Sequence, residues 1–199
     1  KVVAPVSLIV SAFAPVHDVR RTLTPELRAD CGPTRLVLVD LGGGRDRLGG
    51  SCLAQVYGKV GREAPDCDDP QRLRAFFQVV ARLRQDGLAL AYHDRSDGGL
   101  IVTLAEMAFA GRCGVEVELR SSGTAGAVAE LFAEELGAVL QVREADLGRV
   151  LDLLGEAGLG PYARAIGRVV AEDRVRVTGP AGEIFAATRT EHREPRDPP

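Results

Sequence analysis

Tryptophan is absent from the 199 residues, methionine occurs once, and aromatic side chains make up only 5% of the chain. No apolar run approaches the roughly 20 residues that a transmembrane helix needs, so the sequence predicts no membrane span. Residues 2–5, after Lys1, are apolar, but this stretch is short and ends in proline, which is unlike a signal peptide.

Cysteine is scarce and scattered. The four thiols, Cys31, Cys52, Cys67 and Cys113, form no C-x-x-C pair, so the sequence predicts neither a zinc site nor a disulfide framework. Unpaired thiols fit a reducing, cytoplasmic compartment. The formal net charge of -3 indicates neither a nucleic-acid-binding face nor attraction to a membrane surface.

Hydrophobic residues make up 45% of the chain and charged residues 27%, as is usual for a globular domain with a real core. Glycine is abundant, at 23 residues. The chain does not start with methionine and ends in a proline-rich, charged stretch. We therefore expect a fragment of a longer polypeptide, with one domain over 1–190 and a disordered tail over 191–199.

Hydrophobic periodicity predicts a strand-rich chain with interleaved helices. Strands are expected at 6–13, 34–41, 88–94, 115–119, 138–142, 165–170, 174–177 and 184–188. Helices are expected within 18–28 and 51–60, and at 70–86, 98–110, 128–136 and 147–154. The continuous apolar run 36–39 is typical of a strand that is covered on both faces. This order predicts an α/β (α+β) two-layer sandwich, a mixed sheet with its helices packed on one side.

The stretch 89–100 brings together more chemically useful groups than any other. A short apolar run predicts a buried strand that ends in a polar turn with Asp94, Ser96 and Asp97, and Gly98 and Gly99 then open a helix. Free backbone N–H groups and the helix dipole favour anionic ligands at such a turn.

Asp94, Ser96 and the glycine pair of this turn each have two interpretations. Asp94 is either a magnesium ligand or a solvated turn carboxylate. Ser96 donates either to a phosphate or to the turn itself. We expect Asp97 to cap the helix. Gly98 and Gly99 allow close approach of a ligand, but tight packing between elements demands glycine equally.

Other candidates carry weaker signals, and we assign no catalytic residue. His93 has no nucleophile beside it in the sequence, so we expect a packed or hydrogen-bonded side chain. Arg95 pairs either with a phosphate or with a structural carboxylate. Glu134 and Glu135 are expected on the solvated face of a helix end. The glycine clusters near residues 42–50 are not a P-loop, because no Gly-Lys-Ser/Thr follows them.

Four motifs together resemble the phosphoribosylformylglycinamidine synthase family, over roughly residues 5–190. They are the run from His93 to Gly111, the pair Pro5-Val6-Ser7-Leu8 and Ser11-Ala12-Phe13, the pair Asp40-Leu41-Gly42 and Leu48-Gly49-Gly50-Ser51, and the run Glu134-Glu135-Leu136-Gly137-Ala138-Val139. The chain is similar to the C-terminal domain of the second aminoimidazole-ribonucleotide-synthetase-like half of that enzyme.

This resemblance implies a part of an ATP-dependent ligase of purine biosynthesis. The whole enzyme converts formylglycinamide ribonucleotide, ATP and glutamine to the amidine, ADP, phosphate and glutamate. By carry-over, Asp94 is a Mg²⁺ ligand and Ser96 contacts ATP or ADP. The implied partners are the N-terminal synthetase domains and a glutaminase, both absent from this chain, so we expect the fragment alone to be inactive.

Two alternatives stay open. In one, the domain is a non-catalytic scaffold that docks the other domains. In the other, the chain is a different ATP-binding member of the aminoimidazole ribonucleotide synthetase superfamily, such as a selenophosphate or hydrogenase-maturation relative.

Overall fold

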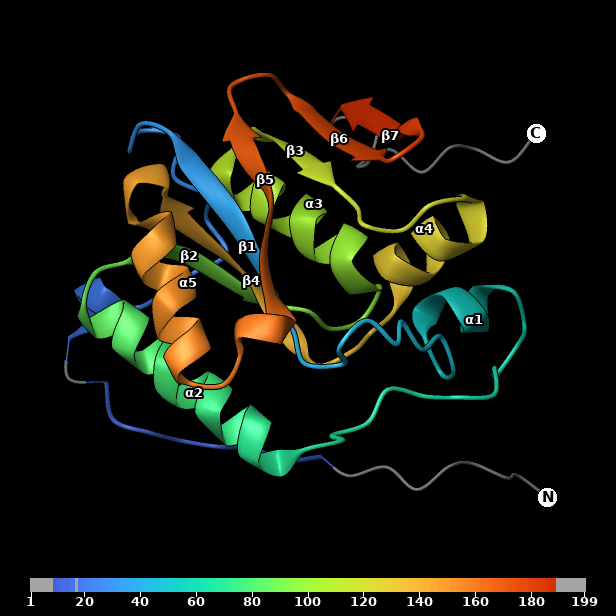
Figure 1. Cartoon of the computed structure of the whole chain (residues 1–199), viewed down its shortest axis with the longest axis horizontal. Helices are drawn as coiled ribbons and strands as arrows, with labels where there is room; N and C mark the ends of the chain where they lie inside the picture. The colour runs from blue at the N-terminus through green and yellow to red at the C-terminus, as the bar shows by residue number, and fades with distance from the viewer. Residues whose placement is uncertain (1–8, 17, 189–199) are drawn as a thin grey trace.

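A single seven-stranded sheet organises the computed structural model, which describes residues 9–16 and 18–188 (Figure 1). The strands lie in the order β2-β4-β1-β5-β3-β6-β7. They are β1 (Thr34–Asp40), β2 (Ala89–Asp94), β3 (Gly114–Glu118), β4 (Gly137–Arg143), β5 (Ala163–Val170), β6 (Arg174–Gly179) and β7 (Gly182–Thr188). β3 and β6 are parallel, while the other neighbouring pairs are antiparallel. The mixed sheet of an α/β sandwich is thus confirmed.

The helices cover both faces of this sheet, which corrects the expected one-sided arrangement of two layers. The α-helices are α1 (Cys52–Val56), α2 (Pro70–Gln85), α3 (Gly99–Gly111), α4 (Thr124–Phe132) and α5 (Leu147–Glu156). Short 3₁₀ turns are η1 (Val19–Arg21), η2 (Glu144–Asp146) and η3 (Gly160–Tyr162). α2 and α5 pack in one hydrophobic cluster and α3 and α4 in another, on opposite faces. The result is three layers.

The central strand β1 explains why both faces are covered. Successive side chains of a strand point to opposite faces. Leu36 and Leu38 accordingly belong to the cluster of α3 and α4, and Val37 and Val39 to that of α2 and α5. All four are at most 2% exposed, as the continuous apolar run predicts.

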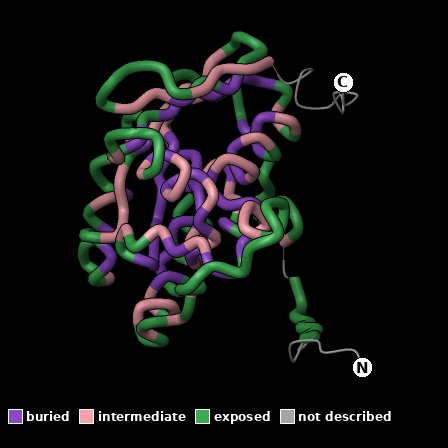
Figure 2. Tube along the Cα trace, turned by 90° about the vertical axis from the view of Figure 1, so that its right-hand side faces the viewer, coloured by how far each residue is buried: buried purple, intermediate pink, exposed green. Residues whose placement is uncertain are grey.

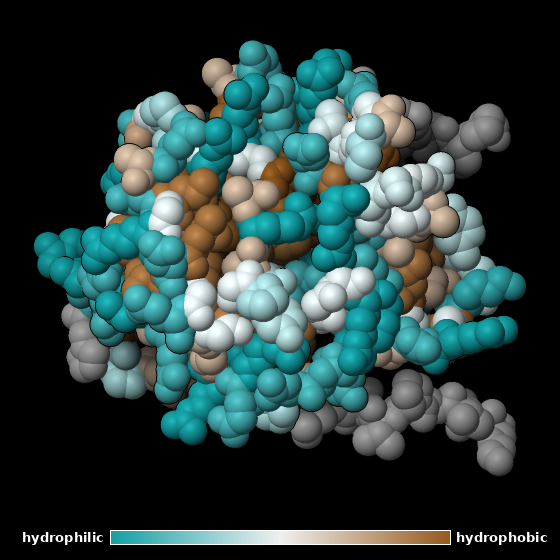
Figure 3. Space-filling view, viewed as in Figure 1, coloured by the Kyte–Doolittle hydropathy of each residue, from teal (hydrophilic) through white to brown (hydrophobic). Residues whose placement is uncertain are grey.

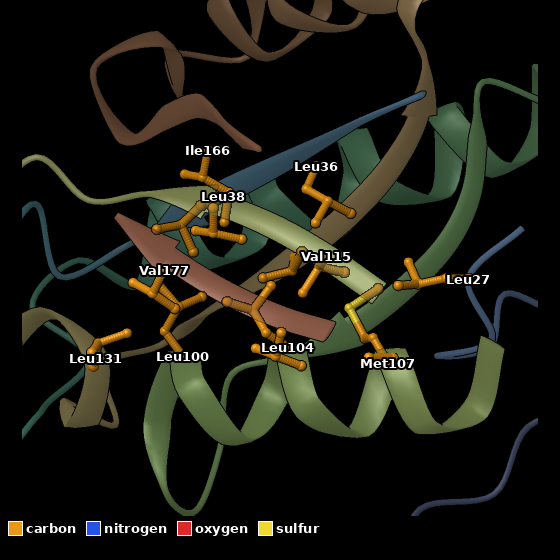
Figure 4. Packing of buried hydrophobic residues seen from close by; sticks show 14 of the residues in the cluster. Leu27, Leu36, Leu38, Leu100, Leu104, Met107, Val115, Leu131, Ile166 and Val177 are labelled. Carbon is orange, nitrogen blue, oxygen red and sulfur yellow. The ribbon is translucent and has the colours of Figure 1, made fainter. Parts of the chain in front are cut away.

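Leucines of α3 fill the larger of the two clusters. Figure 4 shows Leu100, Leu104 and Met107 on the helix face that points toward β3 and β6, where Val115 and Val177 meet them. All five side chains are fully buried. Because the first turn of α3 carries part of this core, its start is fixed in space.

The N-terminal stretch is different from its prediction. Of the expected strand at 6–13, residues 6–8 lie outside the described residues, and residues 9–13 form no strand and are exposed (Figure 2). The expected helix within 18–28 is reduced to η1. β-Branched residues favour a strand only where a neighbouring strand pairs with them, and none does so here in the described part.

Other boundaries shift by a few residues. α1 ends at Val56, and α4 starts at Thr124 and ends at Phe132, short of the expected 136. The predicted tail at 191–199 lies outside the described residues. Within those residues, no helix is long and apolar enough to cross a bilayer. Polar side chains cover most of the face seen in Figure 3, with hydrophobic side chains showing between them.

Candidate functional site

The carboxyl ends of β1 and β2 lie at one edge of the sheet, because both strands pair antiparallel with β4 between them. The last residue of each strand is opposite one of the first two residues of β4. Three loops therefore meet at this edge: 41–51 after β1, 95–98 after β2, and 133–136 before β4.

Asp94 and Ser96 lie exposed where β2 passes into the second of these loops. Asp94 is the last residue of β2, and its side chain is 66% exposed. Its Oδ1 lies 3.5 Å from Nδ1 of His93. Ser96 uses its carbonyl oxygen to accept the N–H of Gly99 at 2.9 Å. Both predicted ligand side chains are thus accessible to a ligand at one turn.

Arg95, between them, points the other way. Its side chain is 1% exposed, and Nη2 lies 2.6 Å from Oδ1 of Asp40, the last residue of β1. Its Nε donates to the carbonyl oxygen of Glu135 at 2.7 Å. Of the two open interpretations, the structure supports the structural ion pair. Arg95 fastens the turn to β1 and to the loop before β4.

The prediction of a solvated helix end for Glu134 and Glu135 is wrong. Both residues follow α4 in the loop 133–136, and Glu135 is fully buried. The Glu135 carboxylate accepts hydrogen bonds from Nε and Nη2 of Arg47, each at 2.7 Å, which raises the pKa of that arginine. Glu134 is half-buried, and its Oε1 accepts backbone N–H groups of Gly98 and Cys52, each at 2.8 Å.

The predicted helix cap at Asp97 is also wrong. Gly98 occupies the N-cap position at φ +83°, and no side chain caps the helix. Gly99 has φ +71°, and a Cβ there would lie 2.7 Å from the carbonyl oxygen of Leu131. Glycine is therefore required by the left-handed backbone and by close packing against α4. Asp97 is left exposed, with its carboxylate available for another role.

His93 is hydrogen-bonded, as expected. Its Nε2 lies 2.7 Å from Oε2 of Glu106 in α3, and its side chain is 14% exposed. This contact ties the end of β2 to the following helix.

The glycine-rich loop after β1 forms turns, as expected. The backbone N–H groups of Gly42 and Gly44 donate to the Asp40 carboxylate at 3.2 and 2.8 Å. Gly49 packs so closely that a Cβ would lie 2.4 Å from the carbonyl oxygen of Glu63. A role for these turns at a domain interface stays a prediction.

A neighbouring network of ion pairs, in which Glu130 is buried, has no signal in the sequence. Arg120 donates to Oδ2 of Asp46 at 2.8 Å across 74 residues of chain, and Arg164 pairs with buried Glu130 across 34. The other oxygen of Asp46, Oδ1, is buried and has no hydrogen-bond partner among the described residues. Burial raises the pKa of Asp46. Such pairs join residues that are distant in sequence, so no local sequence pattern predicts them.

The family description "AIR synthase related protein, C-terminal domain" matches residues 35–180. The chain belongs to this family. The match starts in β1 and ends just after β6, so it includes the three loops of the candidate site. At the level of this domain family, the resemblance drawn from the motifs is confirmed.

Solved structures share the fold of this AIR synthase related domain at low sequence identity. PurL of Thermotoga maritima in complex with ATP has a TM-score of 0.64 and 15% identity, over 86% of this chain and 27% of that chain. The same protein in complex with ADP gives 0.64 and 14%. HypE of Escherichia coli, a hydrogenase maturation protein, has a TM-score of 0.53 and 24% identity, over 87% and 52%. The chain thus spans about a quarter of the PurL chains it matches.

Proposed function

We propose that this domain is part of a phosphoribosylformylglycinamidine synthase, where it supplies one wall of a magnesium–nucleotide site between domains. In the proposed site, Asp94 is a Mg²⁺ ligand and Ser96 contacts the phosphates of ATP or ADP. The remaining walls belong to the other synthetase domains, and a glutaminase supplies ammonia. We place the whole enzyme in the cytoplasm, in keeping with its unpaired thiols.

The observation that carries the proposal is the contrast between the three consecutive residues Asp94, Arg95 and Ser96. Arg95 is buried and fixes the turn, while the side chains on either side of it are exposed. A rigid turn with an exposed carboxylate and hydroxyl fits the preference of Mg²⁺ for one or two protein carboxylates together with phosphate oxygens and water. Bound magnesium would neutralise phosphate charge there.

Solved structures with this fold support the proposal at the level of the fold. The PurL structures that share this fold were solved with ATP, with ADP and with AMPPCP, so nucleotides bind to that protein. At 13–15% identity the likeness concerns the fold, and the transfer of a ligand to this chain is our inference.

A second candidate function is favoured by the match to HypE, whose identity of 24% exceeds that of the PurL structures. Under this alternative, the domain serves another ATP-using member of the superfamily. The synthase is favoured by the sequence motif His93-Asp94-Arg95-Ser96-Asp97-Gly98-Gly99. Turnover of formylglycinamide ribonucleotide distinguishes the synthase from another superfamily member. A third hypothesis, in which the domain is a scaffold that only docks other domains, predicts no loss of bound nucleotide when Asp94 is substituted.

The test uses the full-length protein that carries this domain. Wild type, Asp94→Asn and the control Asp152→Asn, an exposed carboxylate on α5, are purified, and bound nucleotide is released and quantified. Turnover with formylglycinamide ribonucleotide, ATP and glutamine is measured in parallel. We expect Asp94→Asn to lose bound nucleotide while its thermal unfolding stays at the wild-type temperature. Wild-type nucleotide content in Asp94→Asn would refute the ligand role, and absent turnover in the wild type would refute the synthase assignment.

A further inference from the structure

Three potential metal-ligand atoms from three separate segments of the chain meet beside the turn after β2. The thiol of Cys52, a carboxylate oxygen of Asp97 and one of Glu134 all lie within 4.8 Å of one another. Cys52 is the first residue of α1, Asp97 precedes α3, and Glu134 follows α4. These residues are 45 and 37 positions apart, from the numbers 52, 97 and 134, so their spacing predicts no site.

The two carboxylates of this trio lack a cationic partner. No ion pair joins Asp97 or Glu134 to a basic group within the described residues, whereas the nearby Asp40 and Glu135 contact arginine at 2.6 and 2.7 Å. Like charges held this close repel each other, and a bound cation removes that cost. The unbalanced negative charge is an observation separate from the ligand geometry, and it points to a cation.

Backbone hydrogen bonds hold the Glu134 carboxylate in a fixed position. Its Oε1 accepts the N–H groups of Cys52 and Gly98, each at 2.8 Å, and these come from two of the three segments. Such hydrogen bonds to a ligating carboxylate orient it before a metal arrives. The Cys52 thiol in turn donates to the Glu134 carboxylate.

We propose that Cys52, Asp97 and Glu134 bind one divalent transition-metal ion of the zinc type, with water as the remaining ligand. A thiolate favours such ions over Mg²⁺, which prefers oxygen ligands alone. Three protein ligands and one water are also the usual set of an open zinc site. This site goes beyond the proposed function, since it differs from the Asp94 site in both ion and ligands.

Binding changes the protonation of one group. The Cys52 thiol gives its proton to solvent, and the sulfur–metal bond replaces the hydrogen bond from that thiol to Glu134. No electron is transferred, so the metal keeps its charge of +2. One proton is therefore released for each ion that is bound.

The test is a cobalt titration of the full-length protein after chelator treatment. Co²⁺ replaces Zn²⁺ and reports a thiolate ligand through its sulfur-to-metal charge-transfer absorption. The variants are Cys52→Ala, Asp97→Asn and Glu134→Gln, and the matched control is Cys67→Ala, another half-buried cysteine. Glu134→Gln retains an oxygen that accepts the two N–H groups, so it removes charge without removing the anchor.

We expect one equivalent of Co²⁺ with a charge-transfer band that is lost in Cys52→Ala and retained in Cys67→Ala. We expect at least about a tenfold weaker affinity in Asp97→Asn and Glu134→Gln, a scale set by losses at known metal sites. Absence of the band, its survival in Cys52→Ala, or full affinity in both carboxylate variants would overturn the proposal. Circular dichroism confirms that each variant is folded.

The two proposals fail separately. If Asp94→Asn loses nucleotide but no cobalt band forms in the wild type, only the zinc-type site is wrong. If the band behaves as expected while Asp94→Asn keeps its nucleotide, only the magnesium–nucleotide site is wrong.

Discussion

Replacing Arg95 by methionine tests how the turn after β2 is held. Methionine roughly keeps the length of the side chain but removes its charge and every donor. The Arg95 side chain is 1% exposed and the Asp40 side chain 8%, so the substitution leaves a buried carboxylate without its closest positive charge. Carbonyl oxygens of Glu135 and Leu136 also lose a donor, at 2.7 and 3.4 Å.

The magnitude follows from these losses. Removing one partner of a buried ion pair costs about 3–5 kcal/mol of unfolding free energy. The upper part of this range is offset here, because Gly42 and Gly44 still donate N–H groups to Asp40, and Nη1 of Arg120 still lies 3.8 Å from Oδ2 of Asp40. With a urea m value of about 2 kcal/mol/M, a loss of about 3–4 kcal/mol lowers the unfolding midpoint by about 1.5–2 M.

Urea unfolding followed by circular dichroism measures this change. The control is Arg28→Met, which breaks an exposed pair with Asp30 and should leave the midpoint close to that of wild type. The double variant Arg95→Met with Asp40→Asn should lose less than the sum of the single changes, since residue 40 then carries no charge that needs the Arg95 guanidinium. A loss below about 1 kcal/mol in Arg95→Met would refute the argument that this pair fastens the turn.

Three further predictions concern packing and protonation. Gly99→Ala should destabilise the fold by at least about 1 kcal/mol, because φ is +71° and the new Cβ meets a carbonyl oxygen. The control Gly148→Ala, in open space on α5, should be neutral or stabilising. Equal urea midpoints for the two variants would contradict this prediction. Burial raises the pKa of Tyr92 to about 12. Its proton is then held more tightly in the folded state, so the free energy of unfolding should fall as pH rises from about 10 toward 12. Tyr92→Phe should reduce that fall. Parallel plots of unfolding free energy against pH for the variant and wild type would exclude the effect. Burial also raises the pKa of Asp46. The free energy of unfolding should therefore fall as pH rises from about 4 through the folded-state pKa of this group. Asp46→Asn should remove this pH dependence, measured by urea unfolding across that interval. An unchanged pH dependence in Asp46→Asn would show that the carboxylate is not destabilised by burial.

Local signals predicted the regular elements well. α2 starts where Asp69 caps it, with the carboxylate accepting the Gln71 N–H at 2.9 Å and Pro70 at the first position. The buried central strand β1 followed from an unbroken apolar run, since only a strand covered on both faces needs one.

Interactions across the sheet could not be predicted in this way. The unbroken apolar run of β1 indicated two covered faces, but which helix lies on which face depends on the connections between strands, which periodicity does not report. Arg47 and Glu135 are 88 residues apart, so nothing near Glu135 indicated that its carboxylate is buried. Asp97 has a good capping side chain, yet the left-handed Gly98 takes the cap position. Tertiary packing decided each of these cases.

At the candidate site, the sequence identified the turn but not its partners. The exposure of Asp94 and Ser96 agrees with their predicted roles, which stay predictions. The trio of Cys52, Asp97 and Glu134 depends on three loops meeting at one sheet edge, and only the fold brings those loops together.

The most direct test of the central claim is a measurement of metal at Asp94 itself. Mn²⁺ replaces Mg²⁺ in the full-length protein with ADP bound, and electron paramagnetic resonance counts the bound ion. The account predicts a nucleotide-dependent bound Mn²⁺ in wild type and in Asp152→Asn, and its loss or at least about tenfold weakening in Asp94→Asn, as at other metal sites. An equal bound signal in all three proteins would contradict the claim that this turn holds the metal of a nucleotide site.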